Sequence, residues 1–316
     1  MLPGLQPLNG LVAQLLRSRP LMENGMLLLL SMTEITILPQ PFKISNMKNW
    51  ILIYMLLTGN YLFAQVIPVG FLRPINTSIP TGTNPVTTNL LLYLDATRRA
   101  SYDASGGSIW YDISGVSPAN SATLVGNPTF NVADGVGSFT YGLHKYALTS
   151  KLITSTLSSA TFIAWVNPSQ LQDDYTGIII SRNGYSSATG NASGMFISLN
   201  NPNNNVGYVW NGVQNTYSWR NFLNIPSNEW SMIAVSISTG SATAYLCKSS
   251  GITTAVNSVA HSEISGLKFY VGIDPYFEPL NKGFIGKMGT SMVYTTALTY
   301  DNISAIFNAQ KAAFGL

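Results

Sequence analysis

Short apolar runs separated by Gly, Asn, Ser and Pro recur along the chain from Leu90 to its end. Each run has the length of a β-strand, and several alternate apolar and polar residues, as half-buried strands do. The predicted strand segments are 90–95, 108–113, 160–168, 177–181, 194–199, 206–210, 229–238, 241–247, 267–273 and 284–294. This spacing predicts an all-β antiparallel sandwich or jelly roll and not a βαβ protein.

Local patterns add detail to this prediction. Thr239 and Gly240 separate two strand segments by two residues, which predicts a tight hairpin. In segment 284–294, alternation is expected to place Phe284, Met288, Met292 and Tyr294 on one face and Lys287, Gly289 and Ser291 on the other.

Beyond this last strand the apolar period changes to that of a helix. Ile303, Ile306 and Phe307 repeat at helical spacing, which predicts a short C-terminal helix packed on the sandwich. Thr299 is placed to cap that helix, with Leu298 and Ile303 as its hydrophobic staple.

The N-terminal part has a different character. Residues 47–64 combine Lys48, an apolar run and a final Ala64, which is typical of a secretory signal peptide. Their apolar run is shorter than the about 20 residues of a membrane-spanning helix, so no stable span is expected after cleavage. An uncleaved anchor is the alternative. The expected location is outside the cell, either secreted or on its surface.

The remaining boundaries follow from this position. Residues 1–46 are interpreted as an over-extended, unstructured N-terminus, and the alternative makes 26–32 part of a longer targeting sequence. Residues 65–89 are a Thr/Pro-rich linker, and residues 90–316 form one domain.

Composition fits an exported β-rich protein. Only 9% of the 316 residues are charged, and the formal net charge is +3. Lys and Arg are scattered, without a basic stripe among aromatic residues, so nucleic acid is not an expected partner.

Four segments resemble the laminin-G-like jelly-roll branch of the concanavalin A-like lectin/glucanase superfamily. They are "LYLDATRRASYDASGGSIWYDISG" (92–115), "TFIAWVNPS" (161–169), "NEWSMIAVSISTGSATAYL" (228–246) and the closing stretch 284–308. In that stretch the matching residues are Phe284, Gly286, Met288, Tyr294, Ala297, Leu298, Thr299, Ile303, Phe307 and Asn308. The resemblance implies a concanavalin A-like jelly-roll sandwich with a short C-terminal helix over about residues 90–316.

The sequence also departs from the superfamily's pattern. Gly289 and Thr290 replace an Asp-Glu pair, and Asn302 replaces the capping Glu. Segment 139–147 replaces an acidic stretch. If those acids bind calcium or fix loops in relatives, that arrangement is missing here.

Catalytic signatures are not found. The superfamily's β-glucan hydrolases carry E-x-D-x-x-E on one strand, which places the acids on one face. Glu229, Glu263 and Glu278 have no acid two residues away, and His144 and His261 lie in no metal or nucleophile motif. The chain is therefore not expected to be an enzyme.

Four residues are expected to be structural. Cys247 lies in an alternating strand pattern and is interpreted as buried, with a reactive thiol as the alternative. Asp112 is expected to accept hydrogen bonds from nearby backbone amides. Trp165 and Trp230 match structural positions of the resembled family and are assigned to the core.

Loop carboxylates are the candidates for a metal site. Asp173 and Asp174 follow one strand segment, and Asp274 and Glu278 follow another. Carboxylates at strand ends suit calcium, and simple solvation at the surface is the alternative. No other cofactor is expected.

Aromatic residues concentrate among polar ones in segment 203–222. The candidates for carbohydrate binding are Tyr208, Trp210, Tyr217, Trp219 and Arg220. Large aromatics among polar residues often mark recognition surfaces, and core packing is the alternative for each of them.

These observations favour a secreted, non-catalytic, lectin-like domain that binds a carbohydrate or glycoconjugate at the cell surface. The alternative is a structural or adhesive module of a surface layer or phage-like particle that binds protein. A glycoside hydrolase would need acids that the sequence does not place together. The ligand and the oligomeric state are left open.

Overall fold

The computed structural model describes residues 84–104, 106–132, 136–182, 191–200, 203–276 and 282–316. The predicted signal peptide (47–64), the N-terminal segment 1–46 and nearly all of the linker lie outside the described residues.

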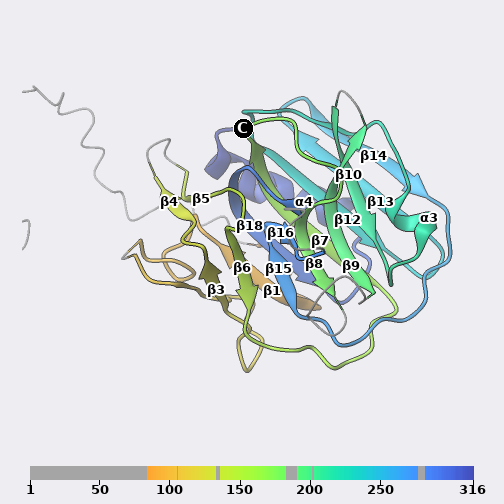
Figure 1. Cartoon of the computed structure of the whole chain (residues 1–316), viewed down its shortest axis with the longest axis horizontal. Helices are drawn as coiled ribbons and strands as arrows, with labels where there is room; N and C mark the ends of the chain where they lie inside the picture. Colours follow the sequence, from red (N-terminus) through yellow and green to blue (C-terminus); the bar gives the residue numbers. More distant parts are fainter. Residues whose placement is uncertain (1–83, 105, 133–135, 183–190, 201–202, 277–281) are drawn as a thin grey trace, which may run out of the picture. The chain divides into compact units, whose positions relative to one another are not determined.

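Two antiparallel sheets of eight strands each form the domain (Figure 1). The first sheet has the order β14 (Gly251–Asn257), β13 (Ala242–Lys248), β12 (Ser231–Ile237), β7 (Ala160–Pro168), β18 (Gly286–Tyr294), β5 (Ser138–Tyr141) and β4 (Thr129–Asn131), and β1 (Leu90–Asp95) also pairs with β18. The second sheet has the order β11 (Asn224–Ile225), β10 (Asn203–Val209), β9 (Ala192–Asn200), β8 (Thr176–Arg182), β15 (Phe269–Val271), β6 (Tyr146–Thr149), β3 (Ala122–Val125) and β2 (Ile109–Trp110).

Smaller elements complete the described chain. A separate pair of short strands is formed by β16 (Ile273–Asp274) and β17 (Lys282–Gly283). The helical elements are α3 (Gln214–Tyr217), α4 (Tyr300–Gln310) and η2 (Lys311–Phe314). The predicted all-β sandwich with a short C-terminal helix is confirmed.

The inner faces of the two sheets share one hydrophobic core. Phe162 of β7 and Phe269 of β15 meet there with ring centroids 6.3 Å apart. The outer face of β7 is buried as well, because Ile163 and Trp165 belong to a second cluster beneath α4. Burial on both faces explains why apolar residues follow one another without a break from Phe162 to Val166.

Helix α4 begins as the sequence predicts. The side chain of Thr299 accepts a hydrogen bond from the backbone N–H of Asn302, and the Asn302 side chain accepts one from the backbone N–H of Thr299. Leu298 and Ile303 are buried together in the outer cluster, so the predicted staple is confirmed. Ile306 and Phe307 are buried in the same cluster.

The predicted faces of the last strand are wrong beyond Met288. The pairing of β18 with β7 shifts register between Met288 and Thr290, which is a β-bulge. Met288 therefore faces the inner core, whereas Met292 and Tyr294 lie in the outer cluster under α4. One extra residue in a strand reverses the alternation of all residues that follow it.

Gly289 at this bulge makes room for an aromatic stack. The ring of Phe314, just after α4, lies parallel to that of Trp165, with centroids 4.1 Å apart and an angle of 7°. A Cβ atom on Gly289 would overlap the Phe314 ring. The Trp165 indole also donates to the Gln310 side chain at 2.7 Å, so the end of α4 is tied to the sheet.

Thr290 faces a carboxylate from the neighbouring strand. It pairs with Asp95 of β1, and its hydroxyl donates to Asp95 Oδ1 at 3.3 Å. Tyr93 donates to Asp95 Oδ2 at 2.7 Å, and Thr97 donates to Oδ1 through its hydroxyl and its N–H. Burial raises the pKa of Asp95, and these hydrogen bonds oppose that rise. An acid is thus present beside the bulge, on β1 instead of β18.

Other structural predictions are also met. Asp112 accepts from the backbone N–H groups of Tyr93, Ser114 and Asn120 at 2.9–3.0 Å. Cys247 is a buried free thiol, and burial raises its pKa to about 12. Ser238 donates its N–H to Ser241 across the predicted hairpin turn at 2.8 Å.

The sequence prediction omitted several strands. Segment 108–113 contributes only the two residues of β2. The strands β3 to β6, β11, β14 and β17 were not predicted. Most of β14 is exposed or partly exposed, so its sequence carries little of the apolar alternation on which the prediction rests.

Gly289→Ala should destabilise the fold, because the added methyl group displaces Phe314 from Trp165. Overpacking of this kind costs about 1–3 kcal/mol of unfolding free energy, measured by urea denaturation. The control is Gly142→Ala, where an added Cβ meets nothing within 4 Å. Equal unfolding free energies for the two variants would contradict the proposed role of Gly289.

Candidate functional site

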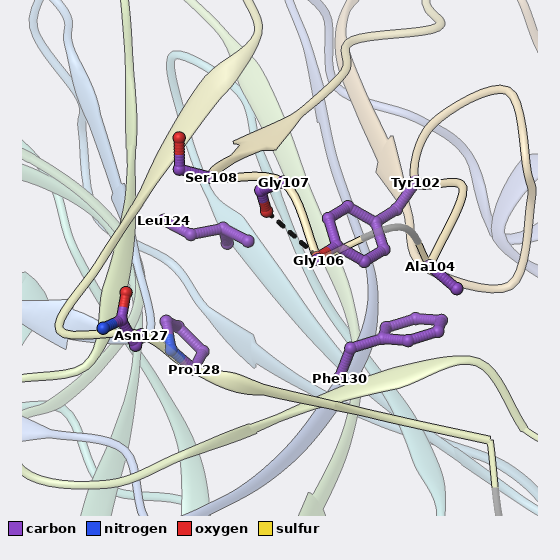
Figure 2. A pocket seen from close by; sticks show the side chains of 9 residues that line it. All are labelled: Tyr102, Ala104, Gly106, Gly107, Ser108, Leu124, Asn127, Pro128 and Phe130. Carbon is purple, nitrogen blue, oxygen red and sulfur yellow. Dashed lines mark hydrogen bonds between the residues drawn. The ribbon is translucent and has the colours of Figure 1, made fainter.

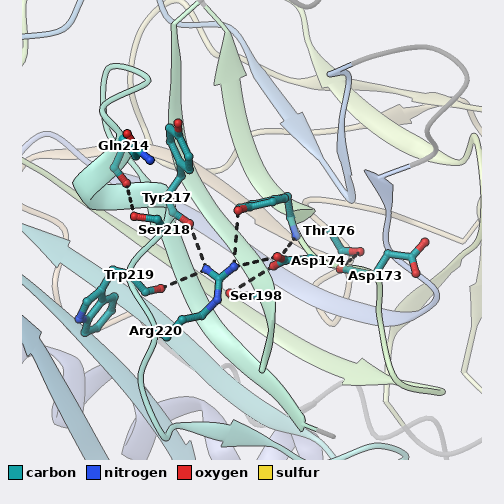
Figure 3. A network of polar contacts seen from close by, with 10 residues as sticks. Asp173, Asp174, Thr176, Ser198, Gln214, Tyr217, Ser218, Trp219 and Arg220 are labelled. Carbon is teal, nitrogen blue, oxygen red and sulfur yellow. Dashed lines mark hydrogen bonds and ion pairs between the residues drawn. The ribbon is translucent and has the colours of Figure 1, made fainter. Parts of the chain in front are cut away.

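Two surface features of the described domain are candidate ligand sites. One is a cavity between two loops near β3 and β4 (Figure 2). The other is a network of polar and aromatic side chains where β8, β9 and the segment after α3 meet (Figure 3). The network contains three of the residues expected to bind carbohydrate, namely Tyr217, Trp219 and Arg220.

The segment that leads into the network is held by a threonine. After β10 the chain passes through Trp210 into the single turn of α3. The Thr216 hydroxyl donates to the carbonyl of Val213 at 2.6 Å and accepts from the backbone N–H of Trp210 at 3.0 Å. This buried side chain fixes the turn, so the residues that follow α3 leave it in a defined direction.

Arg220 lies at the centre of the network. Its Nη2 pairs with Asp174 Oδ2 at 2.8 Å, and its Nη1 donates to the carbonyls of Tyr217 and Trp219 at 3.2 and 3.4 Å. The guanidinium also lies 5.6 Å from the ring centroid of Tyr175. The Arg220 and Asp174 side chains keep 35% and 28% of their exposure, so the pair adds little to stability. Its main effect is to orient the guanidinium.

The aromatic residues of this network pack against neighbouring rings and against the sheet. Tyr175 packs edge-on against Tyr217, with centroids 6.2 Å apart, and Trp219 packs edge-on against the buried Tyr208 at 5.8 Å. Tyr175 and Tyr217 rest on an apolar patch on the outer face of the second sheet. Tyr217 and Trp219 are each partly exposed. Asp174, Tyr175, Tyr217, Trp219 and Arg220 are called the Arg220 cluster below.

Tyr208 and Trp210 do not belong to this surface, which corrects their place among the carbohydrate candidates. Both are 0% exposed and lie in the inner core. The Tyr208 hydroxyl bonds to His261 Nε2 at 3.0 Å and accepts from Asn257 at 2.9 Å. Tyr208 in β10 and Trp210 directly after it do point to the same side, as alternation requires, but that side is the one turned inward.

His261 beside Tyr208 should make stability depend on pH. Burial lowers the pKa of His261 below its ordinary value of 6.5. The unfolded chain therefore binds the proton more readily, and stability falls as pH drops from about 6.5 towards the lowered pKa. His261→Gln should flatten this dependence in urea unfolding measured between about pH 7.5 and pH 5.

The matched control for that experiment is His144→Asn. His144 is exposed and has a φ of 60°, which asparagine tolerates. If the pH dependence persisted in the His261 variant and vanished in the His144 variant, the assignment to His261 would be wrong.

The structure does not bring the four metal candidates together. Asp174 is paired with Arg220, and Asp274 is buried in a two-point ion pair with Arg182 at 2.7 and 2.6 Å. Asp173 is exposed, and Glu278 lies outside the described residues. Within the described ranges, no group of three or more His, Cys, Asp or Glu side chains is close enough to hold a metal ion.

Two of the described candidates already have a cationic partner. Calcium takes six to eight oxygen ligands, usually including several carboxylates. The charges of Asp174 and Asp274 are already balanced by guanidinium groups, so a cation would have to displace an arginine at either one.

Calcium or EDTA should therefore leave the thermal unfolding midpoint of the protein unchanged. A ligand that binds only the folded state raises the midpoint in proportion to the logarithm of its concentration. The comparison should include magnesium at the same ionic strength as a control for general salt effects. A rise in the midpoint with calcium alone would contradict this expectation.

Some residues of the site escaped sequence analysis. Tyr175 was not a candidate, although it carries the contact with the Arg220 guanidinium and has a φ of 64°, unusual for a non-glycine residue. Ser198 of β9 donates to Asp174 Oδ1 at 3.3 Å. Phe222, two residues after Arg220, is 93% exposed. Its position within the aromatic segment 203–222 was the only sequence signal for it.

A sequence model of the Concanavalin A-like lectin/glucanases superfamily matches residues 142–304, more than half of the 316 residues. The chain belongs to this superfamily. The match includes the Arg220 cluster and the strands that carry it. No curated protein matches the chain.

Solved structures resemble the chain only weakly. Domain 4 of AbnA, a GH43 extracellular arabinanase from Geobacillus stearothermophilus in complex with arabinotriose, has 14% identity and a TM-score of 0.48, with 69% of this chain and 98% of that chain covered. Trypanosoma rangeli sialidase has 11% identity and a TM-score of 0.47, with 71% of this chain and 34% of the sialidase covered. In the part of the chain that the structure describes, no helix is long and apolar enough to cross a membrane.

Proposed function

We propose that this member of the superfamily is a non-catalytic domain that binds a carbohydrate or glycoconjugate at the Arg220 cluster. The observation that carries the proposal is the guanidinium of Arg220, which Asp174 and the backbone carbonyls of two partly exposed residues, Tyr217 and Trp219, hold in place. The signal-peptide pattern of residues 47–64 supports a location outside the cell.

Sugars offer two kinds of surface, and the cluster has a counterpart for each. The C–H faces of a sugar ring pack on aromatic rings, and Tyr217 and Trp219 are each partly exposed. Sugar hydroxyls accept hydrogen bonds, and a charged donor gives the stronger ones. Arg220 Nε has no hydrogen-bond partner among the described residues, so it has a donor to offer.

The cluster is also ordered before a ligand arrives. Asp174, the two backbone carbonyls and the Tyr175 ring hold the Arg220 side chain in one position. A side chain that is already immobilised loses less entropy on binding. Immobilising a free surface arginine would cost about 0.5–1.5 kcal/mol of binding free energy. This supports a role in recognition beyond that of a surface ion pair.

The acids near the cluster do not suit glycoside hydrolysis. A retaining glycosidase needs two carboxyl groups about 5 Å apart, one of them able to donate a proton. Asp174 is paired with Arg220, and Figure 3 shows Asp173 pointing away from that pair. We therefore propose that the domain binds its ligand without cleaving it.

A protein-binding adhesive module is the second candidate function. Apolar side chains near the cluster favour it, since Phe222 is 93% exposed, Leu171 44% and Val213 42%. Exposed large apolar residues grouped on a surface often mark protein contacts. Variants of Arg220 and Phe222 can separate the two functions.

Arg220→Gln should weaken glycan binding by at least about tenfold, because it removes a charged donor that contributes about 1.5–3 kcal/mol. Binding would be measured on a glycan array with the full chain, and then by calorimetry with the strongest glycan. The control Arg99→Gln changes an exposed arginine outside the cluster and should bind as the parent does.

The outcomes separate the two candidates. Glycan binding that depends on Arg220 and survives Phe222→Ser supports the proposed function. If no glycan binds the parent protein, the carbohydrate proposal fails. Glycan binding of equal strength in the Arg220 and Arg99 variants would show that the glycan does not bind at the Arg220 cluster.

A further inference from the structure

The cavity in Figure 2 lies far from the Arg220 cluster. It has a volume of about 390 Å³ and lies between the loop that joins β1 to β2 and the turn that joins β3 to β4. Figure 1 shows β4 and α3 at opposite ends of the domain. A ligand in the cavity is therefore separate from one at the Arg220 cluster.

Two aromatic rings form one wall of the cavity. The centroids of Tyr102 and Phe130 are 4.8 Å apart, and both rings pack against the buried Phe139 behind them. The Tyr102 hydroxyl donates to the carbonyl of Gly107 at 3.0 Å, which ties the loop to this wall. Because a core residue supports both rings, the wall is built into the fold.

Polar groups line the opposite side of the cavity. Figure 2 shows the side chains of Ser108 and Asn127 at its edge. The backbone of Gly106 and Gly107 is open there, since an added Cβ at either residue would meet nothing within 4 Å. Asn127 has a φ of 52°, and an asparagine tolerates this left-handed conformation better than most residues.

No charged side chain belongs to the described lining. It consists of Tyr102, Ala104, Gly106, Gly107, Ser108, Leu124, Asn127, Pro128 and Phe130. A charged ligand would lose its hydration here without gaining an opposite charge, which is unfavourable. A neutral ligand with one apolar face and several hydroxyl groups fits the aromatic wall and the amide and hydroxyl groups.

We propose that this cavity is a second ligand site, which takes a single neutral sugar ring. Its volume lies at the low end of the range of about 300–1,000 Å³ that is usual for small-molecule sites. The ring would lie against Tyr102 and Phe130, with its hydroxyls at Asn127 and Ser108. The existence of the site is independent of the Arg220 cluster, whereas the choice of a sugar rests on the proposed function.

The test is a titration of the full chain with neutral methyl glycosides, both hexopyranosides and pentofuranosides, followed by saturation-transfer NMR. Methyl glucuronide serves as the anionic probe. Asn127→Gly removes the side-chain amide and keeps the left-handed backbone, which glycine adopts without strain. Gly107→Val adds a side chain at a lining position where a Cβ meets no other atom within 4 Å, and so narrows the cavity.

Matched controls distinguish a loss of binding at the cavity from a loss of stability and from a loss of binding at the Arg220 cluster. Asn228→Gly makes the same change at an exposed residue outside the cavity with a φ of 62°. Arg220→Gln shows whether a glycoside binds at the Arg220 cluster. Thermal unfolding of each variant shows whether it is folded.

A neutral glycoside should bind the parent, Asn228→Gly and Arg220→Gln proteins equally. Its affinity should fall about fivefold or more in folded Asn127→Gly, as expected for the loss of a hydrogen bond. It should fall further in folded Gly107→Val. The proposal is overturned if no neutral glycoside binds the parent, if Asn127→Gly binds as the parent does, or if the glucuronide binds as well as the neutral sugars.

If neutral sugars bind the parent but only Arg220→Gln loses them, the cavity proposal fails and the function proposed for the Arg220 cluster stands. If the cavity variants lose neutral glycosides and Arg220→Gln does not, the cavity proposal stands, and the function proposed for the Arg220 cluster is decided by its own glycan-array test. The two proposals can therefore fail separately.

Discussion

The parallel stack of Phe314 on Trp165 joins the C-terminal helix to the sandwich, and the architecture around it depends on this contact. Trp165 belongs to β7, which lies between β12 and β18 near the middle of the first sheet. Gly289 in β18 leaves the space for the Phe314 ring, and the bulge turns Met292 and Tyr294 towards α4. Such a stack contributes about 0.5–1.5 kcal/mol beyond the burial of the rings. Its larger effect is to cover the outer face of β7, which lets that strand be apolar on both sides.

Most of the architecture could be predicted from the sequence because strands and helices carry periodic signals. Segments 90–95 and 160–168 agree with β1 and β7 at both ends, and the cap of α4 could be assigned residue by residue. The faces of β18 could not be predicted, because a bulge reverses the alternation without changing the apolar composition. Gly289 was a visible signal, since an isolated glycine within a strand often marks a bulge. Next to Thr290, however, it also fits the replacement of an Asp-Glu pair, which says nothing about strand register.

The candidate site was harder to predict because burial depends on which face of the sheet turns inward. Tyr208 and Trp210 have the same residue types and spacing as surface binders, yet β10 turns them into the core. Tyr217, Trp219 and Arg220 come after the strand, in a segment that the buried Thr216 directs along the surface. The pairing of Arg220 with Asp174 joins residues 46 positions apart. The cavity beside Tyr102 and Phe130 likewise depends on how two loops meet, which local patterns do not encode.

The central claim is that the Arg220 cluster binds the glycan, and tryptophan resonances test it most directly. Trp110, Trp165 and Trp210 are fully buried, whereas Trp219 is partly exposed within the cluster. A ¹H–¹⁵N spectrum of the full chain would be recorded with and without the strongest glycan ligand. The account predicts shifts of the Trp219 indole N–H and the Arg220 Nε–H, with the three buried indoles unchanged. If neither the Trp219 nor the Arg220 resonance shifts at a saturating glycan concentration, the glycan does not bind at the Arg220 cluster.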